Sequence, residues 1–533
     1  RKVVKFFGLV LLNLLVITYL VFHLINIKLN TINIKHEYIK FSLGFEKYGF
    51  EWCEGYGMLI IILGFTYGGL LYYWILKPLF GRFVIGCCQP ISSLKRKLGN
   101  TKHGITIGQS LIYLIIFAAI IIFLILDTVG ARERLMSAGA IVILIAFGCL
   151  FSKHPADINW RPVLSGLILQ FVFGLITIRW AVGREIFQCL SSKVATFLDF
   201  AKSGASFIFS QSLVTDGVFA FAVLPVIFYF SFMIQILHYL GVMQWVIMKL
   251  GWALQSVMGT TLCESINCAA NTFIGMSESP LLIKPYISKL TSSELHAIMC
   301  SGFATVSGTV LAAYIEFDAE PAHLITASVM SAPAALCFSK LFYPETEKSL
   351  TSFDNIELEK SKDTSLLDAA TKGALAGIPI VLGIIANIVS FVSFIALINA
   401  LLTWLGFLVG YQNVTFEWIL SKLFMPLSWI IGVPWDRCEE VGTLIGLKTV
   451  VNEFIAYQKL GEYKKQGLIY GRTEAIATYA ICGFANPGSI GIMIGVLSSL
   501  APEKKEQITG CILRAFIAGT TVCLMTASIA GKQ

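Results

Sequence analysis

Residues 259–280 read GTTLCESINCAANTFIGMSESP, and apolar stretches flank them on both sides. Charged and amide side chains precede a proline in this stretch: Glu264, Asn267, Asn271, Glu278 and Pro280. A carboxylate inside hydrocarbon costs at least about 2.5–3.5 kcal/mol on insertion scales, so such residues usually face a cavity or a partner. Non-helical backbone at membrane depth is tolerated only where protein or a cavity covers it. We therefore expect two half-helices that meet at a break near residues 275–280.

The composition of the whole chain indicates a membrane protein. Of 533 residues, 56% are hydrophobic and 14% are charged, against about 25% charged in soluble domains, and the mean hydropathy is +0.76. The net charge of +8 comes from 40 basic and 32 acidic residues, which fits the basic bias of cytoplasmic loops better than nucleic-acid binding. From this charge balance we expect no nucleic-acid partner. The 13 cysteines form no Cys-x-x-Cys pair or Cys/His cluster, so we expect no disulfide framework and no structural zinc.

Apolar runs long enough to cross about 30 Å of hydrocarbon, which takes about 20 helical residues, recur along the chain. The clearest runs are 6–27, 56–78, 108–126, 137–151, 217–239, 373–404, 474–499 and 508–530, and less pure candidates are 162–178, 294–316, 322–341 and 446–460. The sequence therefore predicts an all-α polytopic membrane protein. Residues 179–209 combine helically spaced apolar residues with basic ones, which favours an amphipathic helix in the interface or an ordinary connecting helix. The charge-rich segment 344–366 is predicted to link two halves.

Breaks of the same kind occur in both halves. After the stretch quoted above, residues 302–308 place two glycines around hydroxyls; after the charged segment, 417–446 contain two prolines among glycines, and 446–454 and 482–489 carry asparagines. A hairpin-like segment followed by a broken span thus occurs twice. This pattern predicts two structural repeats with a binding site at their interface, near the midplane of the bilayer.

Glu278 and Glu453 are the strongest functional candidates among the polar residues. The asparagines have a structural alternative, because an amide hydrogen bond between membrane helices is worth about 1 kcal/mol. Two carboxylates beside amides and hydroxyls instead indicate a polar neutral solute with a small cation. The chain has no GxSxG elbow, HExxH or phosphate-binding glycine loop, so we predict no catalytic residue, no enzyme and no organic cofactor.

These segments resemble the concentrative nucleoside transporters, the sodium-coupled family of animals and bacteria. The resemblance rests on motifs between about residue 160 and the C-terminus: Asn271-x-Phe273-Ile274-Gly275-Met276-Ser277-Glu278-Ser279-Pro280-Leu281-Leu282, Ser293-Glu294-Leu295-His296-Ala297, Ser328-Val329-Met330-Ser331-Ala332-Pro333, Tyr343-Pro344-Glu345, Gly446-x-Lys448-x-x-x-Asn452-Glu453-Phe454 and Cys482-Gly483-Phe484-Ala485-Asn486. The three N-terminal spans look like the extra helices of the animal-type members.

The resemblance implies a role for each matched residue. The nucleobase would contact Gly275, Met276, Ser277 and Glu278, with Phe484 as an aromatic neighbour. The ribose hydroxyls would be held by Glu453, Asn486 and Ser489. The coupling ion, Na⁺, would bind the side chains of Asn271 and Thr305 and the carbonyls of Ile274 and Val306. Asn452 and Lys448 are expected to be supporting residues of the site.

Some positions depart from the family's pattern. Ser277 replaces the usual Thr and Val306 replaces a common Ile. Pro487 is the larger departure, because proline lacks a backbone donor and distorts a helix. The Gly275-Met276 pair looks like that of the purine-preferring members, so the resemblance implies a purine preference.

The resemblance implies that the whole chain is a sodium/nucleoside symporter of the plasma membrane. It would form a homotrimer and contact membrane lipid. Its inverted repeats would contain two re-entrant hairpins, broken transmembrane helices and interfacial helices, and it would move nucleosides such as adenosine, guanosine, inosine and uridine by an elevator mechanism. The alternative is a proton-coupled nucleoside or nucleobase transporter that uses Glu278 or Glu453 as the proton carrier.

The expected division of the chain follows the breaks. Residues 1–160 form N-terminal helices, 161–260 a scaffold with the interfacial helix, and 261–343 the first hairpin and broken helix. The linker at 344–366 leads to a long scaffold helix at 367–412, and residues 413–533 form the second hairpin, the second broken helix and the C-terminal helices.

Overall fold

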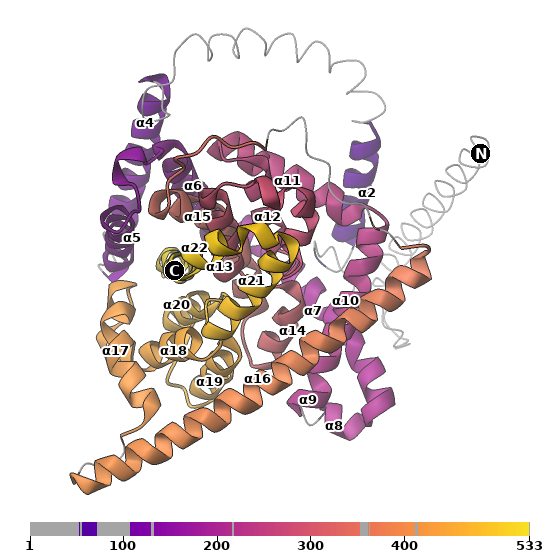
Figure 1. Ribbon diagram of the computed structural model, residues 1–533, viewed down its shortest axis with the longest axis vertical. Helices are drawn as coiled ribbons and strands as arrows, with labels where there is room; N and C mark the ends of the chain where they lie inside the picture. Colours follow the sequence, from indigo (N-terminus) through magenta and orange to yellow (C-terminus); the bar gives the residue numbers. More distant parts are fainter. Residues whose placement is uncertain are drawn as a thin grey trace, which may run out of the picture. The chain divides into compact units, whose positions relative to one another are not determined.

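The computed structural model describes residues 53, 56–71, 107–128, 133–215, 218–351, 361, 363–410 and 414–531, and every regular element in these ranges is helical. The chain divides into two units, Arg1–Pro90 and Ile91–Gln533. The first unit contains α2 (Tyr56–Leu71), inside the expected span 56–78, whereas the expected span 6–27 lies outside the described residues. All elements named below belong to the second unit (Figure 1).

The second unit begins with α4 (Ile107–Thr128), α5 (Glu133–Leu150), α6 (Trp160–Gly174), α7 (Ala181–Phe209), α8 (Gln211–Thr215), α9 (Phe219–Ala222) and α10 (Leu224–Tyr239), with the 3-10 helix η2 (Pro155–Asp157) and the π-helix η3 (Leu175–Arg179). Four expected runs coincide with these elements: 108–126 with α4, 137–151 with α5, 162–178 with α6 and η3, and 217–239 with α9 and α10. The helix expected at 179–209 is confirmed as α7, and its position in a membrane interface stays a prediction. Cys189 of α7 is disulfide-bonded, whereas the nine other described cysteines of the second unit are free.

One series of elements then occurs twice. The first series is α11 (Val242–Met258), the pair α12 (Leu262–Asn271) and η4 (Ser279–Lys289), the broken helix α13 (Ser292–Ala304) and α14 (Gly308–Glu316), and the long helix α15 (Pro321–Phe342). The second series is α17 (Phe416–Ile430), the pair α18 (Cys438–Val450) and α19 (Glu453–Lys465), the broken helix α20 (Gly471–Ile481) and α21 (Pro487–Leu500), and the long helix α22 (Lys505–Ala530), preceded by the turn η7 (Pro502–Lys504). The order of elements therefore repeats, as the distribution of breaks predicted.

The second pair differs from the expected one. The sequence predicts a hairpin at 417–446 and a continuous run at 446–460. In the structure, α17 packs against α18, the turn η6 (Trp435–Arg437) joins them, and the chain breaks after Val450 and resumes as a helix at Glu453. The break forms because the Asn452 side chain caps α19 by accepting a hydrogen bond of 3.0 Å from the Ile455 N–H. The pair that matches α12 and η4 is therefore α18 and α19.

The expected run 474–499 is also two helices, and Pro487 explains part of the break. Asn486 accepts a hydrogen bond of 2.9 Å from the Ser489 N–H and so caps α21. Pro487 is the first residue of α21, where a backbone N–H has no intrahelical partner in any case. This proline therefore starts a helix rather than distorting one.

The two breaks touch each other at the centre of the second unit. The Phe484 N–H donates a hydrogen bond of 3.3 Å to the Thr305 carbonyl. Gly483 permits this approach, because a Cβ there would lie 2.8 Å from the Phe303 carbonyl oxygen and 2.6 Å from Cys523 Sγ. The turn after α12 joins them, since the Gly308 N–H donates to the Phe273 carbonyl at 3.2 Å.

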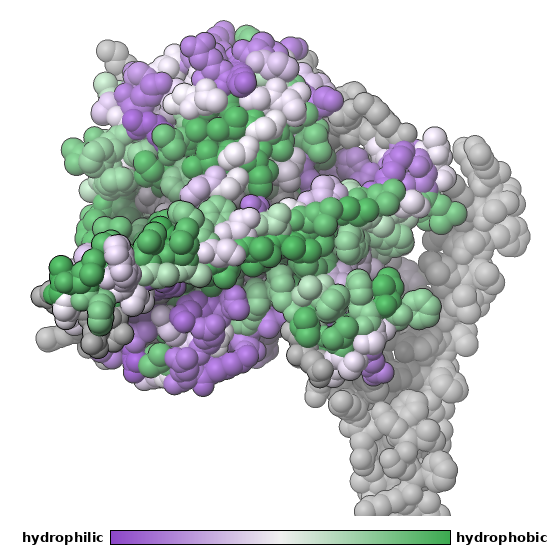
Figure 2. All heavy atoms as spheres, turned by 60° about the horizontal axis from the view of Figure 1, so that its bottom comes forward, coloured by the Kyte–Doolittle hydropathy of each residue, from purple (hydrophilic) through white to green (hydrophobic). Residues whose placement is uncertain are grey.

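A single long helix, α16 (Leu366–Leu408), connects the two series and crosses one face of the unit obliquely (Figure 1). Its 43 residues span about 64 Å at 1.5 Å per residue, which exceeds the thickness of bilayer hydrocarbon and requires a strong tilt. Most of its apolar side chains are exposed, and on the face in Figure 2 they join a band of apolar residues between two polar ends. In the described part of the chain, five helices are long and apolar enough to span a membrane: Trp160–Arg179, Phe219–Tyr239, Pro321–Phe342, Leu366–Leu408 and Pro502–Ala530.

We predict that Gly483→Val destabilises the fold, because the new side chain cannot fit between the Phe303 carbonyl and Cys523. Overpacking of a close contact costs about 1–3 kcal/mol, so the melting temperature of the purified protein in detergent should fall measurably. Gly495→Val is the control, since nothing lies within 4 Å of a Cβ at that position. Equal melting temperatures for the two variants would mean that the crossing does not need a glycine.

Candidate functional site

The breaks and turns of both series surround a cavity of about 330 Å³. The cavity also touches α16 through Ile380 and Asn387. All eight residues that the family resemblance assigns to nucleoside contacts line it: Gly275, Met276, Ser277, Glu278, Glu453, Phe484, Asn486 and Ser489. These residues come from segments that are up to about two hundred positions apart in the sequence, and tertiary packing brings them to one place.

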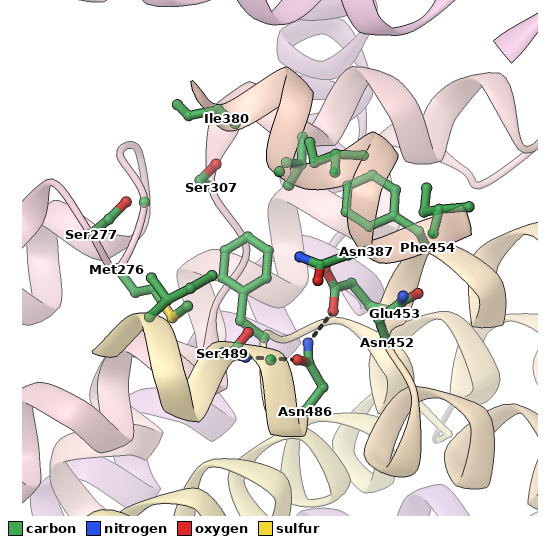
Figure 3. Close-up of a pocket in the computed structure, with 18 of the residues that line it drawn as sticks. Met276, Ser277, Ser307, Ile380, Asn387, Asn452, Glu453, Phe454, Asn486 and Ser489 are labelled. Atoms are coloured by element: carbon green, nitrogen blue, oxygen red, sulfur yellow. Dashed lines mark hydrogen bonds between the residues drawn. The ribbon is translucent and has the colours of Figure 1, made fainter. Parts of the chain in front are cut away.

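Glu453 is the most firmly held polar side chain of the cavity. It is 3% exposed, and its Oε2 accepts a hydrogen bond of 2.6 Å from Asn486 Nδ2 (Figure 3). The Tyr314 hydroxyl of α14 donates to Oε1 at a longer 3.4 Å. Asn486 is itself fixed by the Ser489 N–H. The carboxylate is thus oriented by three elements, and hydroxyl groups of a solute could bind its remaining lone pairs.

The turn between α12 and η4 forms the opposite side of the cavity, where Figure 3 shows Met276 and Ser277 facing the group around Glu453. Met276 is buried against Gly302, whose missing Cβ would lie 2.9 Å from Met276 Cβ. Ser277 and Glu278 are half-buried. One side of the cavity therefore combines an apolar thioether with a hydroxyl and a carboxylate, and the other side carries Glu453 and its amide partner.

The residues expected to bind sodium gather beside this turn. Asn271 Nδ2 donates a hydrogen bond of 2.8 Å to Ser301 Oγ, and Thr305 Oγ1 donates one of 2.8 Å to the Ser301 carbonyl. The carbonyl-bearing segments of Ile274 and Val306 meet through the bond from Gly308 to Phe273. Asn271 Oδ1 is buried and has no hydrogen-bond partner. A hard cation such as Na⁺ prefers oxygen ligands, and an unpaired buried amide oxygen in this region is one such ligand.

The two supporting residues have separate places. Asn452 lines the cavity and caps α19. Lys448 is 1% exposed, and its Nζ lies 3.7 Å from Cys523 Sγ, away from the cavity lining. The spacing of five residues between Lys448 and Glu453 excludes a shared helical face, and in the structure the two residues lie on different helices.

Three polar residues of the site were not predicted from the sequence. Ser301 holds Asn271, the Tyr314 hydroxyl reaches Glu453, and Asn387 of α16 points into the cavity (Figure 3). The sequence could have indicated Asn387, because an amide within a long apolar run usually faces a cavity or a partner. Ser301 and Tyr314 had none, since serines and tyrosines are common in such runs.

Helices broken in pairs around one cavity, within a fold whose long helices can span a membrane, are typical of secondary transporters. Comparison with known families agrees. Three family descriptions match the chain: Na⁺ dependent nucleoside transporter N-terminus over residues 139–212, nucleoside recognition (Gate) over 220–317, and Na⁺ dependent nucleoside transporter C-terminus over 323–531.

The similarity extends to individual relatives. The chain is 48% identical over 437 residues to Solute carrier family 28 member 3 of Eptatretus stoutii, which covers 79% of this chain and 64% of that protein. It is 43% identical over 472 residues to Sodium/nucleoside cotransporter 1 of Oryctolagus cuniculus, which covers 86% and 70%. Among solved structures, CNTnw in an inward-facing substrate-bound state is 37% identical with a TM-score of 0.71, covering 75% of this chain and 97% of that chain.

The chain belongs to the sodium-dependent, concentrative nucleoside transporter family, which confirms the resemblance and the all-α fold. These relatives are named as transporters, so the chain falls in a transporter family and not among enzymes. It spans less than two thirds of the length of the Eptatretus stoutii protein.

We predict that Ser277→Cys reacts with a small water-soluble thiol reagent, because this half-buried residue lines the cavity. Ser528→Cys, on the fully buried part of α22, is the control and should stay unlabelled. Labelling is read by mass spectrometry as one modification beyond those of the parent protein. If both positions react equally, the cavity is not the water-accessible space between the breaks.

Proposed function

We propose that the protein is a sodium-coupled symporter that imports nucleosides across the plasma membrane. The observation that carries the proposal is the Glu453 carboxylate, which Asn486 and Tyr314 hold at the edge of a 330 Å³ cavity facing Met276 and Phe484. A ribose has adjacent hydroxyl groups that can donate to a carboxylate, and its base is a flat ring that packs against apolar and aromatic side chains. One cavity thus offers complementary surfaces to the two parts of a nucleoside.

The assignment of individual contacts follows from the two sides of the cavity. Gly275, Met276, Ser277 and Glu278, with Phe484 nearby, would contact the base. Glu453, Asn486 and Ser489 would hold the ribose. Adenosine, guanosine, inosine and uridine fit these requirements, and the apolar Met276 favours a purine, whose larger ring gains more from contact than from one edge hydrogen bond.

Sodium coupling is supported by the unpaired Asn271 Oδ1 next to Thr305 and the break carbonyls. Each positive charge that moves inward gains about 2.3 kcal/mol per 100 mV. Since about 1.4 kcal/mol corresponds to a tenfold ratio, one sodium ion can sustain accumulation well beyond tenfold even before its own concentration gradient is added.

The mechanism we propose is alternating access by an elevator motion. The cavity is enclosed by breaks and turns of both series on one side and by α16 on the other, so a displacement of the series along α16 would carry the site. In this proposal the α12–η4 and α18–α19 pairs are re-entrant hairpins of two inverted repeats, and α7 lies in the interface. The exposed apolar face of α16 would meet lipid or a neighbouring subunit of a homotrimer. CNTnw has been solved in inward-facing and outward-facing states.

Uptake of labelled adenosine and uridine into proteoliposomes tests the function. We expect uptake in sodium but not in choline, and no stimulation by an acidic exterior, which is the signature of the proton-coupled alternative. Glu453→Gln should lower kcat/KM by about 10- to 150-fold, since a hydrogen bond to a charged group is worth about 1.5–3 kcal/mol. Glu503→Gln, an exposed carboxylate outside the cavity, is the matched control. Uptake by Glu453→Gln at the parental rate would remove this residue from the site.

A second expectation concerns the base. Met276→Gln adds a base-edge hydrogen-bonding group where the parent protein offers only a thioether. The ratio of adenosine to uridine kcat/KM should therefore fall, by about tenfold if one hydrogen bond of about 1 kcal/mol is gained by uridine and apolar contact is lost by adenosine. Met248→Gln, half-buried on α11 and outside the cavity, should leave the ratio unchanged. An unchanged ratio for Met276→Gln would show that the base preference is set elsewhere.

A further inference from the structure

The two series of helices share a sequence at their breaks. The last turn of α13 reads Ser301-Gly302-Phe303-Ala304, and the residues that follow α20 read Cys482-Gly483-Phe484-Ala485, so Gly-Phe-Ala occurs next to both breaks. In the first series the three residues are the end of the helix, and in the second they are the break itself. Ser301 and Cys482 therefore hold corresponding positions in the two series.

The helix before each turn places polar side chains near this position. In the first series, Asn267 and Asn271 of α12 donate to Ser301 Oγ at 3.2 and 2.8 Å, and Asn271 is the one nearer the turn. In the second series, Lys448 near the end of α18 lies 3.7 Å from Cys523 Sγ, which in turn lies 3.2 Å from the Cys482 carbonyl oxygen. A threonine follows each of these residues, and a glutamate of the cavity comes later in the chain, Glu278 seven residues after Asn271 and Glu453 five residues after Lys448. Lys448 thus corresponds to Asn271, the residue whose free oxygen we assign to sodium.

Lys448 is 1% exposed, and within the described residues its ammonium forms no direct salt bridge. The nearby Glu453 carboxylate interacts with the ammonium electrostatically without such a contact. A buried charge needs oriented dipoles or oxygen partners, since desolvation alone costs several kcal/mol per ion. Cys523 Sγ, beside the ammonium, also lies 3.8 Å from the Ala304 carbonyl. The C-terminal ends of both α13 and α20 therefore converge here, and the negative ends of two helix dipoles favour a cation.

We propose that the Lys448 ammonium is the tethered counterpart of the sodium ion, occupying in the second series the cation position that sodium occupies beside Asn271 in the first. The two series together then hold one exchangeable cation, the sodium ion, and one permanent cation, the Lys448 ammonium. Since Lys448 cannot dissociate, the second position contributes nothing to coupling in the parent protein. This inference rests on the proposed sodium site at Asn271.

The first test removes the tethered charge and supplies the oxygen of the first series. Purified full-length chain carrying Lys448→Asn should bind one more ²²Na⁺ ion per protomer than the parent at saturation, whereas Lys448→Arg, which keeps the charge, should not. Thermal melting in sodium and in choline accompanies the count. Lys448→Asn should melt at a lower temperature than the parent in choline and regain stability as sodium rises, because a ligand that binds only the folded state stabilises it. An unchanged ion count, or equal destabilisation in both salts, would overturn the proposal.

The reciprocal test places a tethered cation in the first series. Asn271→Lys should lose one bound sodium ion per protomer and should bind labelled adenosine equally in sodium and in choline. An Asn271→Lys protein that still requires sodium for adenosine binding would contradict the inference.

A third variant separates this inference from the proposed function. If Asn271→Ala leaves ²²Na⁺ binding unchanged, the sodium site itself has been misassigned, whatever Lys448 does. If Asn271→Ala weakens ²²Na⁺ binding and Lys448→Asn fails to add an ion, the sodium site stands and only the role of Lys448 is wrong.

Discussion

The close contact between the two broken helices is the constraint on which the rest of the site depends. The Phe484 N–H reaches the Thr305 carbonyl only because Gly483 has no side chain between the Phe303 carbonyl and Cys523. This contact leaves helix ends, with their unpaired carbonyl and amide groups, in the interior of a fold that otherwise has apolar helices. Polar side chains, cations and a solute can be accommodated there because those ends supply oriented dipoles.

The broken helices also explain why a few side chains have more than one function. Asn486 caps α21 and simultaneously orients Glu453, so the same amide starts a helix and positions a carboxylate. Asn452 caps α19 and lines the cavity. Each cap satisfies backbone groups that a break would otherwise leave unpaired. Changes at these residues should therefore affect folding and binding together, and variants at Glu453 or Met276 separate the two more cleanly.

A repeated architecture with unequal side chains can bind unlike ligands at corresponding places. Both series bring a helix end to a Gly-Phe-Ala break, yet one carries Asn271 and the other Lys448. An amide oxygen can accept a hydrogen bond or bind a cation, whereas an ammonium is itself a cation and a donor. The same asymmetry holds in the cavity, where Met276 and Ser277 face Glu453 and Asn486. In the proposed function, asymmetry of this kind would give a two-part solute, with a base and a sugar, a single binding orientation.

The sequence by itself determined the class of fold and the breaks near 275–280, 302–308 and 482–489, because polar groups and prolines in apolar runs are visible in one dimension. The family resemblance added eight of the residues that line the cavity, from Gly275 to Ser489. Tertiary structure alone decided which helices pair. The pairing of α18 with α19, the helix-starting role of Pro487 and the contacts of Ser301, Tyr314 and Asn387 depend on neighbours far along the chain, such as Tyr314 and Glu453, which are 139 residues apart. No local pattern encodes such a contact, since it arises only when the two breaks cross.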